Sequence, residues 1–324
     1  MADKKLKVFF LGSGHIAVPS LAAIAQSAHL ELVGTGTQPD KNAGRGKKLT
    51  PTPVGRTAEE LNLAPMKIKN INDPEIVAQI SALNPDFILV IAFGQLLKEE
   101  IINLPSISCI NVHASILPTY RGASPIASAI LNGEKESGIS IMEIEKGLDS
   151  GPVFKIITTP IEPNDNSDTL ETKLSVLSAE NIVDSLIEIS KGAVKTIQNH
   201  QLSTHCRKIA KTDGQLDWKD SATSLRNKIQ AFYPWPGAYF FMETDKGPKR
   251  ITIVSAGICS ESSLELPGTI VDGEKKRWLI ACGNQEILEL YQVKPEGKKM
   301  MVAADFLRGS RLVPGTNLDF KEKF

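Results

Sequence analysis

An asparagine, a histidine and an aspartate carry the clearest chemistry in this sequence. Asn111 and His113 are two residues apart at the end of an apolar run, Ile107 to Val112, which is typical of a buried strand. Side chains two apart on a strand point to the same face, so both are predicted at the carboxyl edge, where open α/β sheets bind ligands. Asp149 follows later, in a turn between two glycines, where its carboxylate could orient an imidazole.

These three residue types suffice for direct transfer of an acyl group to an amine. An amide NH₂ can donate to an oxyanion, and a histidine can take a proton from the amine or pass one to the leaving group. A nearby carboxylate fixes the ring tautomer and favours the imidazolium. Because the set holds no nucleophilic serine or cysteine and no metal ligands, the acyl donor must be an outside cofactor. A buried Asn111 and His113 that merely satisfy each other are the alternative.

A dinucleotide-binding motif competes with this interpretation. Gly12-Ser13-Gly14-His15-Ile16-Ala17 satisfies G-x-G-x-x-G/A after a predicted strand and before a predicted helix. The ribose-binding acid should end the second strand, but Leu32 to Thr37 ends without one. Glu31 lies at the beginning of that strand and Asp40 is already in the next loop. We therefore favour a tight strand-to-helix turn over a nicotinamide site.

A polar loop, residues 37–50, is a second candidate binding segment. It holds four basic residues, Lys41, Arg45, Lys47 and Lys48, against the single acid Asp40. Such loops in compact domains are usually functional or disordered, and flexible basic side chains suit a phosphate backbone. The whole chain has 37 basic and 37 acidic residues, but residues 191–324 hold 21 basic and 15 acidic residues. A nucleic-acid partner or an unevenly charged, solvated surface would both fit.

A parallel sheet covered by helices must position the candidate residues. Short, continuous apolar runs are typical of strands buried on both faces. Helix candidates alternate with them, including one that opens with a capping Asp73 and Pro74. The alternation predicts a doubly wound, mostly parallel α/β domain over residues 1–190, which a long amphipathic stretch from Asp168 closes. The predicted strands are Leu6 to Leu11, Leu30 to Gly36, Phe87 to Ala92, Ile107 to Val112 and Ile139 to Ile144, and the helices include Ala17 to Ala25 and Val54 to Leu63.

The second half of the chain has a different pattern. A polar linker is predicted over residues 191–208, followed by short β runs around one helix, Ala222 to Phe232. We expect an OB-like β-barrel over residues 209–324. Its predicted strands are Tyr239 to Glu243, Arg250 to Ser255, Gly268 to Val271, Trp278 to Cys282 and Ile287 to Val293.

Composition places the chain among ordinary globular proteins, with 41% hydrophobic and 23% charged residues. No apolar run approaches the ~20 residues that span a bilayer, and we expect neither a signal peptide nor an anchor. The four cysteines form no CxxC pair, so we expect buried thiols in a cytoplasmic protein and no metal site. They are Cys109, Cys206, Cys259 and Cys282.

Two ordered motifs resemble a known family. NVHASILPTYRGASPI, from Asn111, is similar to the N-x-H-x-S-x-L-P-x-x-R-G-x-x-P signature of formyltransferases that use 10-formyltetrahydrofolate. GISIMEIEKGLDSG, residues 138–151, resembles their second signature, G-[VI]-[ST]-x-M-x-x-x-x-G-L-D-[ST]-G. The similarity extends over DFILVIAFGQLL, KIAKTDGQLDW and IQAFYPWPGAY, and these point to the branch that formylates methionyl-tRNA.

The resemblance implies roles for particular residues. Asn111, His113 and Asp149 would be the catalytic set, and the inserted basic loop would meet the tRNA acceptor arm through Arg45, Lys47 and Lys48. The reaction would be transfer of a formyl group from 10-formyltetrahydrofolate to the α-amino group of initiator methionyl-tRNA, for translation initiation. We expect a monomer without a metal. The segments expected to bind the folate are Ser115-Ile116-Leu117-Pro118 and Phe93-Gly94-Gln95-Leu96.

Two departures from the family pattern lie outside the expected catalytic set, and three rival functions stay open. Gly12 to Ala17 replaces the usual F-x-G-T-P-x-F-A sequence, and Pro152 replaces a common aspartate. A formyltetrahydrofolate hydrolase is expected to carry an amino-terminal regulatory domain, whereas the first strand here is predicted near residue 6. A nucleotide-sugar formyltransferase is opposed by the basic loop and the positive second half. A catalytically idle RNA-binding protein would use only the OB-like half.

Overall fold

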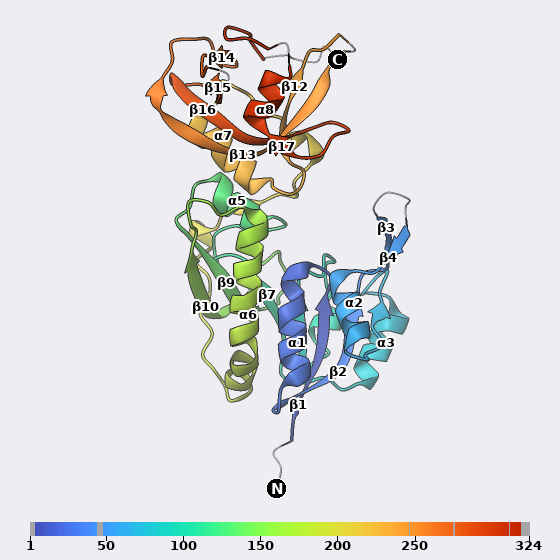
Figure 1. The fold of residues 1–324 in the computed structure, drawn as a ribbon. Coiled ribbons are helices and arrows are strands. Elements are labelled where there is room, and N and C mark those ends of the chain that lie inside the picture. Colours follow the sequence, from blue (N-terminus) through green and yellow to red (C-terminus); the bar gives the residue numbers. More distant parts are fainter. Residues whose placement is uncertain (1–3, 44–47, 246, 275, 311, 319–324) are drawn as a thin grey trace. The chain divides into compact units, whose positions relative to one another are not determined.

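The computed structural model describes residues 4–43, 48–245, 247–274, 276–310 and 312–318. Two compact units make up the chain, each with its own hydrophobic core (Figure 1). The stretch expected to be a linker, residues 191–208, is divided between the units after Cys206, and the domain boundaries stay a prediction. The first unit comprises Met1–Pro125, Glu136–Pro160 and Leu170–Cys206, and the second Ile126–Lys135, Ile161–Thr169 and Arg207–Phe324.

Seven strands form the central sheet of the first unit, in the order β10-β9-β7-β6-β1-β2-β5. The strands β7, β6, β1, β2 and β5 run parallel to one another. At one edge, β9 is antiparallel to both of its neighbours, β7 and β10. This arrangement confirms the predicted doubly wound, mostly parallel sheet. Their bounds are β1 (Leu6–Gly12), β2 (Leu30–Thr37), β5 (Met66–Lys67), β6 (Phe87–Ile91), β7 (Ser108–His113), β9 (Glu136–Glu143) and β10 (Val153–Pro160).

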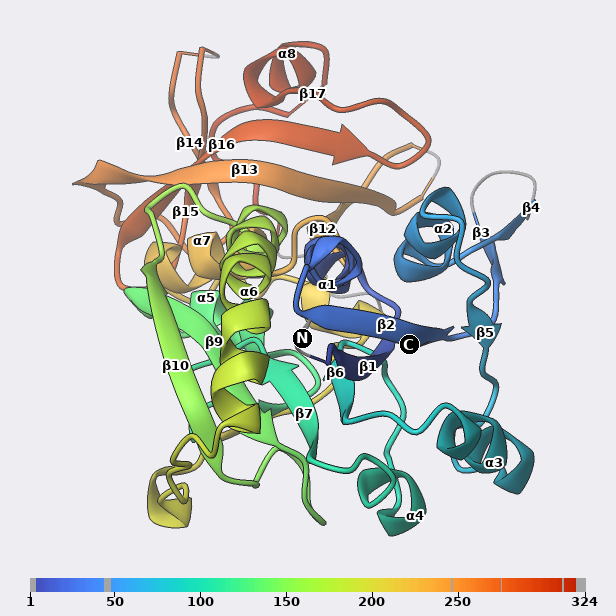
Figure 2. The same cartoon turned by 90° about the horizontal axis from the view of Figure 1, so that it is seen from below.

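Continuous apolar strands are buried because helices cover both faces of the sheet (Figure 2). All five residues of β6 are buried, as its sequence predicts. α1 (Val18–Gln26), α2 (Pro53–Glu60) and α6 (Ser167–Ser190) lie on one face, and α3 (Pro74–Ala82) and α4 (Glu99–Ile102) on the other. The predicted cap of α3 is present, since the Asp73 side chain accepts from the Glu75 N–H.

A curled antiparallel sheet forms the second unit, so the predicted OB-like barrel is present as a half-barrel. Register shifts along β13, at Ile253/Ser255 and Ile258/Ser262 among others, are bulges of the kind that bend a strand. The rings of Trp218, Phe240 and Trp278 pack edge to face in its core. The elements are α5 (Pro125–Leu131), η3 (Lys211–Gly214), α7 (Ala222–Ala231), β12 (Ala238–Met242), β13 (Lys249–Ser262), β14 (Ile270–Val271), β15 (Trp278–Ala281), β16 (Glu286–Pro295), β17 (Met301–Val302) and α8 (Ala303–Arg308).

Smaller elements surround the central sheet of the first unit. The loop predicted over residues 37–50 contains a β-hairpin whose arms are β3 (Lys41–Ala43) and β4 (Lys48–Thr50). Its alternating polar and apolar residues are too few to predict strands from sequence. The others are η1 (His15–Ala17), β8 (Arg121–Gly122), η2 (His200–Leu202) and β11 (His205–Cys206).

Candidate active site

Asn111 and His113 lie at the carboxyl end of β7, next to the antiparallel strand β9. Main-chain pairing places Asn111 opposite Met142 and His113 opposite Ser140. His113 is 6% exposed, and Asn111 is partly exposed. The alternation of the strand puts the two side chains on one face, as the sequence predicts.

Asp149 joins these two residues from the loop that follows β9. Its Oδ1 lies 3.5 Å from Asn111 Nδ2, and its Oδ2 lies 3.6 Å from His113 Nδ1. Oδ2 also accepts from the main-chain N–H of Gly122 at 2.8 Å. The structure therefore brings together the three side chains that the sequence singled out. The carboxylate lies between the amide and the imidazole.

The hydrogen bonds of His113 define which ring nitrogen can act as a base. Nε2 lies 2.9 Å from the main-chain oxygen of Tyr120, and a carbonyl oxygen can only accept, so Nε2 carries a proton. In the neutral ring the lone pair is then on Nδ1, which faces Asp149. A proton taken up at Nδ1 would be stabilised by that carboxylate.

The segment Ser115–Pro118 supports the site mainly from inside the protein. Ser115 is 2% exposed, and its hydroxyl donates to Thr119 O at 2.6 Å. Leu117 is 3% exposed and packs in a small apolar cluster with Met142 and Val153. Ile116 and Pro118 keep partly exposed side chains, so only these two of the four have side-chain surface available to a ligand.

The segment Phe93–Leu96, which follows β6, also has two residues held by the protein and two with exposed surface. The Phe93 ring is buried in the core, and its main-chain oxygen accepts from Gln38 Nε2 at 2.8 Å. Gln95 is held by Ile71 N–H and Ile68 O, at 2.8 and 3.0 Å. Gly94, with a φ of 80°, and Leu96, at 70% exposure, present the available surface.

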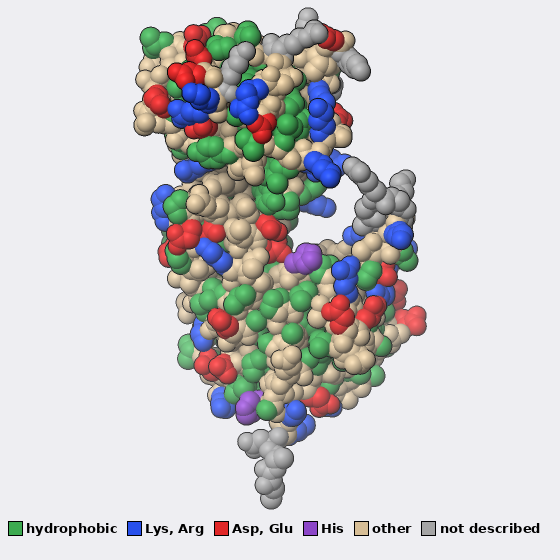
Figure 3. Space-filling view, in the orientation of Figure 1, with side chains coloured by type: hydrophobic (Ala, Val, Ile, Leu, Met, Phe, Trp, Pro, Cys, Tyr) green, Lys and Arg blue, Asp and Glu red, His purple; other side chains and the backbone are tan. Residues whose placement is uncertain are grey.

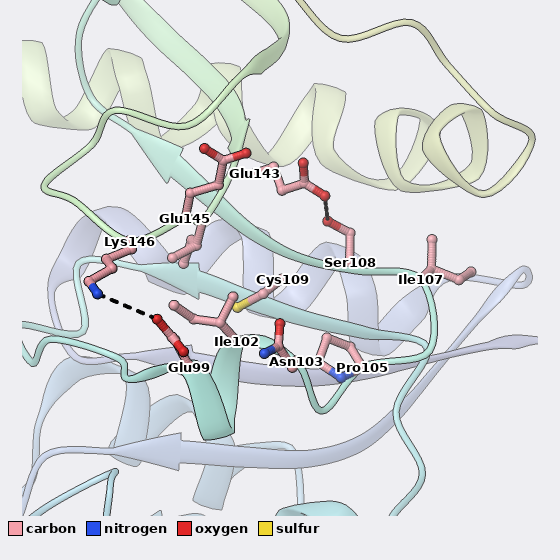
Figure 4. Close-up of a pocket in the computed structure, with 11 residues that line it drawn as sticks. Glu99, Ile102, Asn103, Pro105, Ile107, Ser108, Cys109, Glu143, Glu145 and Lys146 are labelled. Atoms are coloured by element: carbon pink, nitrogen blue, oxygen red, sulfur yellow. Dashed lines mark hydrogen bonds and ion pairs between the residues drawn. The ribbon is translucent and has the colours of Figure 1, made fainter. Parts of the chain in front are cut away.

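A cavity of about 480 Å³ lies in the first unit, and none of the eight residues predicted to bind a cofactor lines it. This volume is in the range of small-molecule sites, ~300 to 1,000 Å³. Figure 4 shows an ion pair between Lys146 and Glu99 at one side and a hydrogen bond from Ser108 to Glu143 at the other, at 3.8 and 3.0 Å. The lining residues are Glu99, Ile102, Asn103, Pro105, Ile107, Ser108, Cys109, Glu143, Ile144, Glu145 and Lys146.

The cavity and the cluster of Asn111, His113 and Asp149, the predicted catalytic cluster, share two chain segments. Cys109, on the cavity, and Asn111 are on the same face of β7, and two strand residues span about 7 Å. Lys146, also on the cavity, is in the same loop as Asp149. Burial raises the pKa of the Cys109 thiol, so this side chain lines the cavity as a neutral group.

Sequence reasoning missed the cavity residues, although part of the signal was present. Glu143, Glu145 and Lys146 lie inside the second signature, at positions for which the signature specifies no residue type. Ile102 follows the FGQLL segment by a few residues. Variable positions inside a motif carry no pattern of their own, so only the fold shows that they meet.

The Gly12 to Ala17 turn serves packing and helix capping. A Cβ on Gly12 would lie 2.8 Å from the Phe10 ring and 3.0 Å from Ile91 O, so the glycine permits close approach of the two strands. The Ile16 N–H, in the first helical turn, donates to Glu171 Oε1 at 3.1 Å. A carboxylate of the protein therefore occupies a donor that a nucleotide phosphate would need.

Of the three predicted tRNA-binding residues, the structure describes one. Lys48 is exposed at the beginning of β4, whereas Arg45 and Lys47 lie outside the described residues. Lys41 Nζ donates to Gln38 Oε1 at 2.9 Å at the base of the hairpin. On the face of each unit that Figure 3 shows, basic and acidic side chains are interspersed.

Two absences hold for the part of the chain that the structure describes. In that part of the chain, no group of three or more His, Cys, Asp and Glu residues could hold a metal ion. None of its helices is long and apolar enough to cross a membrane. Cys109, Cys206 and Cys282 are buried free thiols, and Cys259 is partly exposed.

Comparison with known proteins agrees with the motifs. Residues 4–186 match the formyl transferase family, and residues 208–311 match the formyl transferase C-terminal domain. The chain is 36% identical over 314 residues to the methionyl-tRNA formyltransferase of Geobacter metallireducens, covering 97% of this chain and 98% of that protein. It is 37% identical to the enzyme of the same name from Geobacter sulfurreducens, covering 97% and 96%.

A solved structure shares the fold at lower sequence similarity. It is a sugar 3N-formyltransferase, crystallised in the presence of dTDP and 5-N-formyl-tetrahydrofolate. It superposes with a TM-score of 0.65 at 17% identity, covering 91% of this chain and all of that chain. The fold is therefore common to formyltransferases with different acceptors, whereas the two near-full-length relatives share one name. This chain belongs to the methionyl-tRNA formyltransferase family.

Proposed function

We propose that Asn111, His113 and Asp149 carry out formyl transfer from 10-formyltetrahydrofolate to the α-amino group of initiator methionyl-tRNA. One observation carries this assignment: the Asp149 carboxylate lies 3.5 Å from Asn111 Nδ2 and 3.6 Å from His113 Nδ1. This distance pattern supports the proposal, because formyl transfer calls for an oxyanion donor, a base and a charge that stabilises the protonated base.

His113 acts on the proton of the attacking amine. The amine of an aminoacyl ester has a pKa below the ~7.7 to 8.0 of a free α-amino group, so much of it is neutral and nucleophilic. As the nitrogen adds to the formyl carbon, Nδ1 takes up the proton that the amine loses. Asp149 stabilises the resulting imidazolium, and Tyr120 O keeps Nε2 in place. The same proton can then pass to the leaving N10 of tetrahydrofolate.

Asn111 stabilises the charge that develops on the formyl oxygen. One N–H of its Nδ2 faces Asp149 Oδ1, which orients the amide, and the second N–H can donate to the oxyanion. The carboxylate thus orients both the base and the oxyanion donor. No covalent intermediate with the protein is needed, because the folate supplies an already activated formyl group.

The cavity of about 480 Å³ suits the pterin end of the folate. Ile102, Cys109 and Ile144 give apolar walls for a flat ring. Glu143, Glu145 and the Asn103 amide give oxygens that can accept from the N–H groups of a pterin. Ile116 and Pro118, which are partly exposed, and Gly94 and Leu96, which are exposed, offer surface for the rest of the folate.

An acceptor assay separates the proposed function from its rivals. The purified protein is incubated with 10-formyltetrahydrofolate and either charged initiator tRNA or a nucleotide-linked amino sugar, and the products are identified by mass spectrometry. We expect N-formyl-methionine on the tRNA. Formylation of the sugar alone would favour a nucleotide-sugar formyltransferase. Tetrahydrofolate release without any acceptor would indicate a hydrolase, and no product a catalytically idle RNA-binding protein.

The basic hairpin is proposed to contact tRNA phosphates. Replacing Arg45, Lys47 and Lys48 together by Ala should flatten the salt dependence of tRNA binding by about two log units per log unit of salt. The KM for tRNA should rise while the KM for the folate stays unchanged. A matched control removes three exposed lysines elsewhere, Lys69, Lys135 and Lys191. Equal slopes for the two triple variants would contradict a specific role of the hairpin.

A cytoplasmic monomer is the proposed state of the protein. The substrates, a tRNA and a soluble folate, are both cytoplasmic in this scheme. Each unit has its own hydrophobic core, so the fold of each unit needs no second copy to bury its apolar residues. Sedimentation of the purified protein would check the monomer.

A further inference from the structure

A glutamine from the expected linker reaches the turn that carries Asp149. Gln198 is 6% exposed, and both polar atoms of its side-chain amide are engaged within the first unit. Its Nε2 donates to the main-chain oxygens of Asp149 and Gly151, at 3.0 and 2.7 Å. Its Oε1 accepts from Nε and Nη2 of Arg121, at 3.1 and 2.7 Å. Two donors and two acceptor positions of one buried amide are thus satisfied beside the catalytic cluster.

The turn that Gln198 holds has an uncommon backbone conformation. Asp149 has a φ of 49°, in the left-handed region that few non-glycine residues adopt. The two oxygens that accept from Gln198 lie on either side of Ser150, so a single amide group closes this turn. Closure of the turn directs the Asp149 carboxylate toward the Gly122 N–H, at 2.8 Å, and toward the imidazole.

Gln198 also binds the opposite wall of the site through Arg121. Arg121 is 4% exposed and contacts two neutral acceptors, Gln198 Oε1 and, at 3.2 Å, Nδ1 of His200. It belongs to residues 120–122, whose main chain contacts both the imidazole and the carboxylate of the site. The same segment is paired with β11, which continues the chain from Gln198. Gln198 therefore connects the two main-chain segments that orient the catalytic pair.

We propose that Gln198 is a positioning residue for formyl transfer and acts through the Asp149 carboxylate. This inference rests on the proposed function of His113 and Asp149. Loss of the Nε2 donors lets the turn relax and moves the carboxylate away from the imidazole. The turnover number should fall. The KM values for folate and tRNA should change little, because Gln198 does not line the cavity and is not part of the β3–β4 hairpin.

The substitution Gln198→Glu removes the two N–H donors of the amide while the length of the side chain is kept. The variant keeps the size of the side chain and the acceptor for Arg121, but it sets an oxygen against two carbonyl oxygens. We expect kcat to fall about 10- to 100-fold, because a misplacement of about 1 Å can cost ~10² in rate. Gln201→Ala, at an exposed glutamine three positions later, is the control and should match wild type. If Gln198→Glu does not fold by circular dichroism, Gln198→Met replaces it.

A double-mutant cycle with Asp149→Asn distinguishes positioning from a merely structural role. If Gln198 acts through the carboxylate, its substitution should cost little further rate once that charge is absent. Losses of equal size in both backgrounds, or a wild-type kcat in the single Gln198 variant, would overturn the inference. A wild-type kcat in Asp149→Asn alone would instead overturn the proposed function of the site, so the two failures are distinguishable.

Discussion

Two strand ends on the same edge of the sheet carry sequence motifs, but only one of these motifs brings polar side chains together. β1 ends in the turn Gly12–Ala17, and β7 ends in the segment Asn111–Gly122. Both strands run parallel to β6, which lies between them, so both turns leave the same carboxyl edge. The first end satisfies a dinucleotide-binding spacing, but Glu171 accepts from its helical N–H. At the second end an amide, an imidazole and a carboxylate converge.

The difference teaches that glycine spacing reports backbone geometry, whereas converging polar side chains report chemistry. A Cβ on Gly12 would meet the Phe10 ring, so the core alone accounts for that glycine. No comparable packing argument accounts for a buried His113 that faces Asp149. Burying polar groups is costly unless they are paired, and here both ring nitrogens of His113 lie beside protein oxygens, while one N–H of the Asn111 amide is left for a substrate.

The largest expected effect on turnover comes from replacing the histidine at the β7 end, and the histidine at the β1 end serves as its control. His113→Ala should lower kcat by about 10² to 10⁴, which is what a positioned acid–base group contributes. His15→Ala makes the same substitution at the exposed histidine beyond β1 and should leave kcat near wild type. Steady-state kinetics with saturating folate and methionyl-tRNA measures both, after circular dichroism has shown that each variant is folded. Similar losses in the two variants would remove the functional distinction between the strand ends.

Asn111→Ala should have the next largest effect, on turnover rather than on donor binding. Removal of one oxyanion donor typically costs ~10² to 10³ in kcat. Asn103→Ala, within the cavity, is the matched control and should raise the KM for the folate without lowering kcat as much. Retention of more than about a tenth of wild-type kcat in Asn111→Ala would contradict the oxyanion role.

The sequence predicts the strands, and the shared face of Asn111 and His113, well because these signals are local. A run such as Phe87 to Ala92 is apolar at every step, and β6 is buried at every residue. Asn111 and His113 share a strand face by period alone. The turn between two glycines marks Asp149 in the sequence, but the contact of Asp149 with His113 depends on the fold.

Contacts between distant segments could not be predicted from the sequence. Gln198 reaches Asp149 across 49 residues, from a stretch whose polar composition predicts a linker. Glu171 caps the turn at Ile16 across 155 residues. The cavity draws on α4, β7 and the loop after β9, and none of these segments signals a pocket by itself. Such features depend on which surfaces the sheet order brings together.

The smallest expected effect concerns the β1 end, where Glu171→Ala removes the acceptor of the Ile16 N–H. Loss of a helix cap costs about 1 kcal/mol, so the free energy of unfolding measured in urea should fall by about that amount. Formylation should stay near wild type, because Glu171 contacts none of the three catalytic residues through this bond. Calorimetry should show no saturable NAD or NADP binding by either protein, while a folate analogue should raise the Tm of both. Dinucleotide binding by Glu171→Ala alone would mean that the carboxylate blocks a working nucleotide site. Dinucleotide binding by the wild type would mean that the Gly12 motif is a dinucleotide-binding site, as its spacing suggests.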